Sequence, residues 1–82
     1  MTNLEKYNRI IKRDLKAADE DLNDEVMAYL RYKHWESVVH VEMVADLEEA
    51  FGVMFSTIDI TSFSTYSRGI EILRSLGVDM DA

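Results

Sequence analysis

Residues 34–52 read HWESVVHVEMVADLEEAFG, and this stretch decides the fold. It contains no proline, and its single glycine, Gly52, stands at the end, where glycine commonly closes a helix. The apolar residues that recur at helical spacing are Val41, Val44, Leu47 and Phe51. We therefore predict a helix that begins near Ser37, ends before Gly52 and buries this apolar side.

The opposite side of the same helix is acidic. It carries Glu42, Asp46 and Glu49, and Glu36 comes directly before Ser37. Such a face either keeps a small protein soluble or offers fast, salt-screened contacts to basic partner surfaces. We predict that Glu36, Glu42, Asp46 and Glu49 bind partners, and we leave out Glu48, which lies nearer the apolar side.

Ser37 stands where this helix begins. A hydroxyl at a helix N-terminus has two interpretations that the spacing alone leaves open. It can serve as an N-cap that accepts a hydrogen bond from a backbone N–H group. It can also carry a phosphodiester, because the free N–H groups and the positive end of the helix dipole favour a negative group there.

The rest of the chain also favours helices, because it has no proline and only three glycines. A first helix is indicated by helical spacing in Leu4, Tyr7, Ile10, Ile11, Leu15 and Ala18. Residues 19–36 should form a long ordered loop with apolar anchors, among them Trp35. Residues 57–61 alternate like a strand without a partner, so a short helical turn is expected there. A last helix should start after Ser64 or Thr65 and end at Gly77, with a loose tail from about residue 78.

Composition limits the function. Eighty-two residues form one domain with a modest core, and 48% hydrophobic residues suffice for folding. The net charge of −7 repels phosphate backbones and anionic membranes, so nucleic acid is not expected as a partner. There is no cysteine, no signal-peptide pattern and no apolar run long enough to span a bilayer. We expect a monomer in the cytoplasm, without membrane insertion.

Other chemistries fit the sequence poorly. Ser37 and His40 lack the glycine-rich elbow and oxyanion site of a serine hydrolase. The run from Asp19 has Asp24 where a calcium loop needs its turn glycine. His34 and His40 are six residues apart, which does not place both rings on one helix face. We expect no catalytic residue and no metal site.

The order of a long helix, a long loop, a second long helix, a short helix and a final helix resembles the acyl carrier protein family over nearly the whole chain. In that family an Asp-Ser-Leu motif precedes the second helix. Here Val41-Glu42-Met43-Val44 and Leu47-Glu48-Glu49-Ala50-Phe51 fall at the family's distances from Ser37, while Glu36 replaces the aspartate and Val38 the leucine. The resemblance implies an all-α, four-helix bundle with a long loop between helices I and II and a short helix III.

The resemblance also implies a function. Ser37 would accept 4′-phosphopantetheine from coenzyme A, and the thiol of that arm would carry acyl groups as thioesters to biosynthetic enzymes with basic docking patches. The partners would include a phosphopantetheinyl transferase, and the chain itself would not be an enzyme. Two alternatives remain open: an aminoacyl or peptidyl carrier of the same fold, and an acidic helical interaction module without a prosthetic group.

Overall fold

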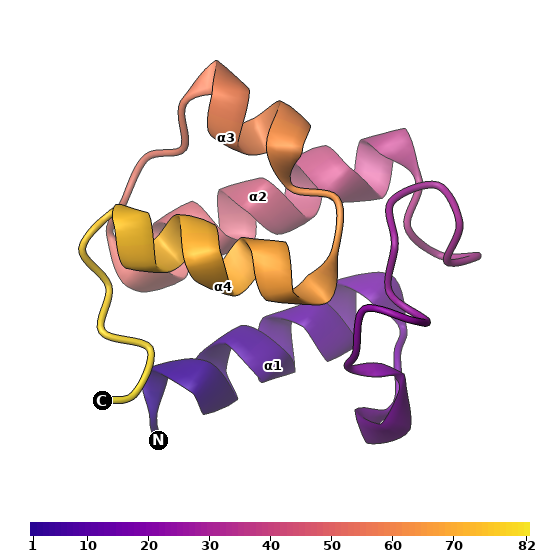
Figure 1. Cartoon of the computed structure of the whole chain (residues 1–82), viewed down its shortest axis with the longest axis horizontal. Coiled ribbons are helices and arrows are strands. Elements are labelled where there is room, and N and C mark those ends of the chain that lie inside the picture. Colours follow the sequence, from indigo (N-terminus) through magenta and orange to yellow (C-terminus); the bar gives the residue numbers. More distant parts are fainter.

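Four helices and one 3₁₀ turn make up the regular structure of this chain. The computed structural model describes residues 1–82, and its helices are α1 (Asn3–Leu15), α2 (Ser37–Phe51), α3 (Thr57–Ser62) and α4 (Tyr66–Ser75), with the 3₁₀ turn at Asp19–Asp21 (Figure 1). The only β-type pairing is an isolated bridge between Ala28 and Thr65. The predicted all-α class is thus confirmed, as are the bounds of the second helix and the short helix over residues 57–61.

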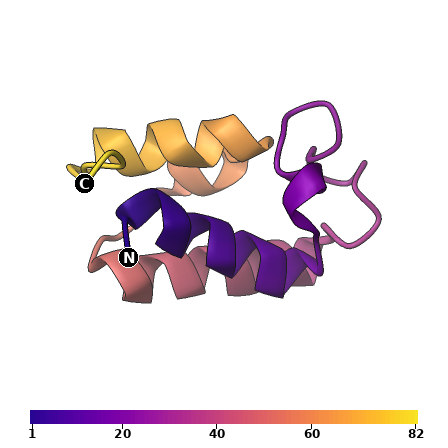
Figure 2. The ribbon, with the colours of Figure 1, turned by 90° about the horizontal axis from the view of Figure 1, so that it is seen from below.

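The three longer helices lie roughly side by side. α1 runs in the opposite direction to α2 and α4, and α3 lies above α2 at the top of the view (Figure 1). Seen from below, α1 and α2 form one layer and α4 the other, with the long loop between α1 and α2 at one end (Figure 2). This loop spans residues 16–36.

The helix ends show why the chain folds locally as it does. The side chains of Thr2, Ser56 and Thr65 each accept a hydrogen bond from a backbone N–H group in the first turn of α1, α3 and α4, respectively. The N-cap residue of α2 is Glu36, and its side chain makes no such bond. At its other end, α2 is closed by Gly52 with a φ of 63°, as predicted.

The core lies between α1, α2 and α4. Its fully buried side chains include residues of the long loop and of the chain end; they are Trp35, Tyr7, Phe63, Ile11, Leu15, Met27, Met43, Leu47, Ile72, Leu73 and Met80. Trp35 is the loop anchor that was expected. The first helix is confirmed, but the prediction was wrong at its two ends, where Leu4 and Ala18 are exposed.

The predicted buried side of α2 is confirmed at Val44 and Leu47 but was wrong at Val41. Val41 is 64% exposed, whereas the neighbouring His40 is 6% exposed and faces the core beside Met43, Val44 and Leu47. One residue turns a helix by about 100°, so the core-facing row begins at His40 and not at Val41. A histidine at this position is tolerated because both of its ring nitrogens find partners.

The chain end was also predicted incorrectly. Residues 78–82 are not a loose tail, because Met80 is 2% exposed and packs in the core. The backbone N–H group of Asn3 donates to the carbonyl of Ala82 at 2.7 Å, and the Asn3 amide donates to the carbonyl of Asp79 at 2.9 Å. Both ends of the chain are therefore fixed to each other.

None of the helices combines the length and the apolar character that crossing a bilayer requires.

Candidate functional site

Ser37 is the first residue of α2, and its side chain is exposed. The N-cap interpretation was wrong, since Glu36 occupies that position and the Ser37 hydroxyl caps nothing. α2 is consequently the one α-helix of the four whose first turn has no side-chain cap. Its orphan backbone N–H groups remain open to solvent or to an anion next to the Ser37 oxygen.

The Ser37 hydroxyl has one hydrogen-bond partner. Its Oγ lies 3.2 Å from the Oη of Tyr29, in the loop before α2. Tyr29 is held in turn: its backbone N–H group donates to the carbonyl of Ser64 at 2.9 Å, and its ring lies 4.7 Å from that of His40. The loop therefore holds the Tyr29 hydroxyl in a fixed position beside the Ser37 hydroxyl.

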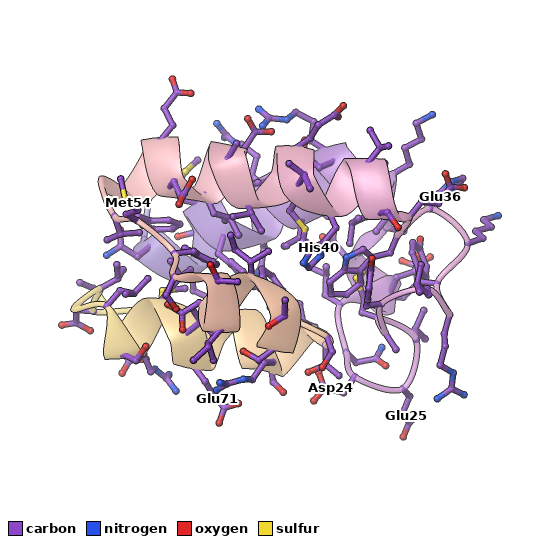
Figure 3. All side chains as sticks on the ribbon, turned by 90° about the horizontal axis from the view of Figure 1, so that it is seen from above. Asp24, Glu25, Glu36, His40, Met54 and Glu71 are labelled. Atoms are coloured by element: carbon purple, nitrogen blue, oxygen red, sulfur yellow. The ribbon has the colours of Figure 1, made fainter.

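His40 connects three parts of the fold below Ser37. The indole Nε1–H group of Trp35 donates to Nδ1 of His40 at 2.9 Å, so the ring proton is on Nε2, which donates to the carbonyl of Ile60 in α3 at 2.8 Å. Figure 3 shows His40 directed from α2 into the interior and Glu36 at the outer end of the helix. Because both nitrogens are engaged, neither is available to take a proton from Ser37.

A groove leads from Ser37 along the junction of α2 and α3. Its first part has a volume of about 340 Å³ and is lined by Tyr29, Ser37, His40, Val41, Ile60 and Thr61. A second hollow of about 140 Å³ is lined by Val41, Val44, Ala45, Glu48 and Ile60. The two parts share Val41 and Ile60, so an apolar surface continues from the serine over the middle of α2.

The acidic residues of α2 differ in their availability. Glu36, Glu42 and Glu49 are exposed, and none makes an ion pair within the chain. Asp46, in contrast, accepts a hydrogen bond from Nη2 of Arg13 in α1 at 3.1 Å and has a side chain 37% exposed. The charge of Asp46 is therefore partly balanced by Arg13 within the molecule.

A carboxyl pair lies beside this ion pair. Burial raises the pKa of Asp14, the nearby negative charge of Asp46 raises it further, and the hydrogen bond from Arg13 opposes both. One carboxyl oxygen of Asp14, Oδ2, is buried without a hydrogen-bond partner. The contact between α1 and α2 therefore contains one incompletely hydrogen-bonded carboxyl group, which the sequence did not indicate.

Sequence reasoning missed three residues of this site. Tyr29 was not singled out, His40 was not expected in the core, and Glu48 was not counted among the partner-binding acids. Glu48 lines the groove, and its Oε2 accepts a hydrogen bond from the backbone N–H group of Phe55 at 2.8 Å, which fixes the turn into α3. The sequence signal that could have shown the burial of His40 is its position within an otherwise apolar stretch.

Nothing in the fold gathers three or more His, Asp or Glu side chains in an arrangement for a metal ion. Comparisons of the chain with protein-family models, with curated proteins and with solved structures found no match.

Proposed function

We propose that this protein is an acyl carrier protein, with 4′-phosphopantetheine attached to Oγ of Ser37. The observation that carries the proposal is the uncapped N-terminus of α2 with an exposed serine at its first position. A phosphodiester there would accept hydrogen bonds from N–H groups that otherwise lack protein partners. The four helices would then form the acyl-carrier arrangement, with the loop over residues 16–36 and the short helix α3.

Attachment would leave the protein's own residues little chemical work. The Ser37 oxygen would form a new bond to the phosphorus of coenzyme A that bears the pantetheine arm, the diphosphate bond would break, and the adenosine bisphosphate would leave. The Ser37 proton would go to a base on the transferase, since His40 has no free ring nitrogen. Once bound, the arm supplies a thiol that holds acyl groups as thioesters. The chain itself has no cysteine and therefore no thiol of its own.

The groove supports an acyl cargo. It begins at Ser37, and its walls at Val41, Val44 and Ile60 are aliphatic. An acyl chain that lay along it would cover Val41, which is 64% exposed, and would gain about 25 cal/mol for each Å² of apolar surface removed from water. Because apolar contact is non-directional, the groove would not select one particular acyl chain over another.

Partner enzymes would dock on the exposed acids around the serine. Glu36, Glu42 and Glu49 are free to contact basic side chains of a phosphopantetheinyl transferase and of acyl-loading and acyl-using enzymes. Such contacts speed association and are weakened by salt, which suits repeated short encounters of a monomeric carrier. Asp46 would contribute less than the other three, because it is already paired with Arg13.

The test is the intact mass of the protein after incubation with coenzyme A and a broad-specificity transferase. We expect one added phosphopantetheine, lost in Ser37→Ala. The matched control is Ser64→Ala, since Ser64 is also exposed and its hydroxyl makes no hydrogen bond. A chain that stays unmodified with several transferases, while folded, would favour the acidic interaction module. An arm that accepts only amino acids from adenylating enzymes would favour the aminoacyl or peptidyl carrier.

A further inference from the structure

Some of the basic side chains of this acidic protein have partners within the chain, and others have none. Of nine Lys and Arg residues, five make ion pairs or hydrogen bonds within the chain; these are Lys6, Lys12, Arg13, Arg68 and Arg74. The other four, Arg9, Lys16, Arg31 and Lys33, make none, and all four are exposed. Three of these four, Lys16, Arg31 and Lys33, line one hollow.

This hollow lies at the loop end of the molecule, between the end of α1 and the loop before α2. It has a volume of about 500 Å³ and is lined by Lys16, Ala18, Asp21, Val26, Arg31, Tyr32, Lys33 and His34. The rings of Tyr32 and His34 meet edge to face with centroids 5.9 Å apart. Three cations and two aromatic rings therefore converge on one concave surface.

The three cations outnumber the acids of the lining and form no ion pair with them. Asp21, the one acid in the lining, accepts hydrogen bonds from the Tyr32 hydroxyl at 3.0 Å and from the backbone N–H group of Ala18 at 3.2 Å. Asp19 is paired with Lys12 at 2.7 Å, and Asp24 accepts hydrogen bonds from Ser67. The hollow keeps a local excess of positive charge in a chain whose net charge is −7.

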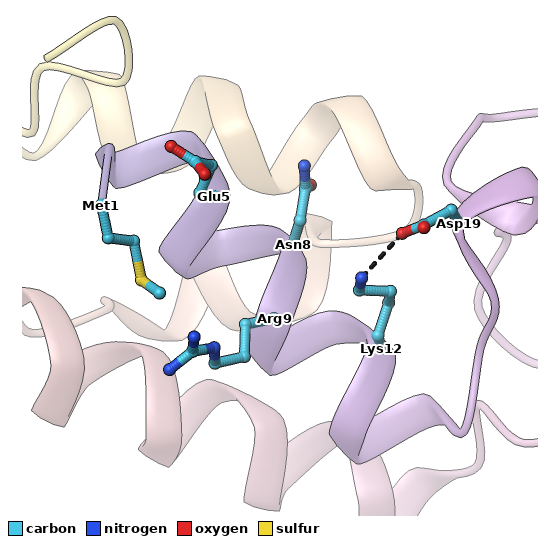
Figure 4. A pocket seen from close by; sticks show the side chains of 6 residues that line it. All are labelled: Met1, Glu5, Asn8, Arg9, Lys12 and Asp19. Atoms are coloured by element: carbon cyan, nitrogen blue, oxygen red, sulfur yellow. Dashed lines mark hydrogen bonds and ion pairs between the residues drawn. The ribbon is translucent and has the colours of Figure 1, made fainter.

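A second hollow shows the contrast. It lies along α1 and contains Arg9 and Lys12, but also Glu5 and Asp19, and the Lys12–Asp19 ion pair crosses it (Figure 4). Its two basic side chains are matched by two acids. The loop hollow has three basic side chains and one acid, so only there are several cations left without partners.

We infer that the loop hollow binds a small phosphorylated molecule with at least two negative charges, such as a diphosphate. Lys and Arg are the side chains that bind phosphate oxygens, and the volume is that of a small-molecule site. A large polyanion such as nucleic acid fits less well, because the rest of the acidic surface repels it beyond the hollow. Tyr32 and His34 offer ring surface to a planar group joined to the phosphates, so a nucleoside diphosphate should bind more tightly than pyrophosphate.

The inference does not depend on modification of Ser37 and is tested on the unmodified full chain. Backbone amide signals are followed by NMR at constant ionic strength while pyrophosphate, and separately ADP, is added. We expect saturable shifts confined to the loop hollow, at Lys16 and residues 31–34. In Arg31→Gln/Lys33→Gln the affinity should fall on the order of tenfold or more, because two charged contacts are lost.

The matched control is Arg9→Gln/Arg74→Gln, which removes the same charge outside the loop hollow and should leave the affinity unchanged within about twofold. The unliganded spectra of both double variants verify that they fold. Shifts that do not saturate, or an equal loss of affinity in the two double variants, would overturn the inference, because either result means unspecific attraction. Equal affinities for ADP and pyrophosphate would overturn the part assigned to Tyr32 and His34.

Discussion

Replacement of His40 by phenylalanine tests the connection that holds the loop, α2 and α3 together. Phe keeps an aromatic ring among Tyr29, Trp35 and Phe63 but removes both hydrogen bonds of the imidazole. The Nε1–H group of Trp35, in a side chain 1% exposed, is then left without an acceptor, and the Ile60 carbonyl without this donor. A buried polar group without a partner costs about 1–3 kcal/mol, and the Ile60 carbonyl at the groove falls at the lower end because water can reach it.

The expected fall in the free energy of unfolding is therefore about 2–4 kcal/mol. At about 4–8 °C for each kcal/mol in a domain of this size, the melting temperature should fall by about 8–32 °C. Urea denaturation followed by far-ultraviolet circular dichroism measures this without relying on the single tryptophan. The matched control is His34→Phe, because His34 makes no hydrogen bond, and it should change the free energy by less than about 0.5 kcal/mol.

A double-mutant cycle makes the test specific. Trp35→Phe removes the donor of the same hydrogen bond, so Trp35→Phe/His40→Phe should cost about 1–2 kcal/mol less than the sum of the single variants. Additive losses, or a loss below about 0.5 kcal/mol in His40→Phe, would refute the reasoning, since they would mean that the bond contributes nothing to stability.

Three further substitutions and one change of solvent test other contacts. In Gly69→Ala the new Cβ would lie 2.3 Å from Oη of Tyr7 and 2.6 Å from the Phe63 ring, so thermal melts should show a loss of about 1–3 kcal/mol. Lys16→Gly should raise the free energy of unfolding by about 0.5–1 kcal/mol, because Lys16 has a φ of 53°, which glycine adopts without strain. The same variant should bind diphosphate more weakly. A loss of both stability and binding would contradict the prediction for stability. Asp14→Asn should stabilise the protein near neutral pH by about 1 kcal/mol in urea titrations and leave stability below pH 3 unchanged. The reason is that the pKa of the Asp14 carboxyl group is raised in the folded state. Its protonated form is therefore fully compatible with folding below the unfolded-state pKa, and stability is lost as the pH rises through the folded-state pKa and the group ionises. Because the net charge is −7, added salt or lower pH towards 5 should raise the melting temperature of the native sequence, and melts independent of salt would argue against this.

Much of the fold could be predicted because its signals are local. Spacing of apolar residues, the glycine after Phe51 and the hydroxyl of Thr65 located α2 and the start of α4. Such signals act within one or two helical turns, so a window of sequence contains them. Ser37 could be singled out in the same way, since its position at a helix start is a local property.

The burial of His40 in place of Val41 was not a local property. Val41 and His40 are neighbours, and hydrophobicity alone favours burial of the valine. The structure buries His40 because Trp35 from the loop and Ile60 from α3 supply partners for both nitrogens. A polar side chain becomes a core residue only when distant segments satisfy it, which no window of sequence shows.

The sequence by itself determined that the chain forms helices, where α2 begins and ends, and that the serine at its start is accessible. These follow from backbone preferences and from the alternation of apolar and polar residues. Tertiary structure alone decided that Tyr29 meets Ser37, that the chain end packs against α1, and that Lys16 joins Arg31 and Lys33 in one hollow. Those contacts join residues from separate segments, and their geometry exists only after the helices have packed, because packing, and not propensity, sets the distances between them.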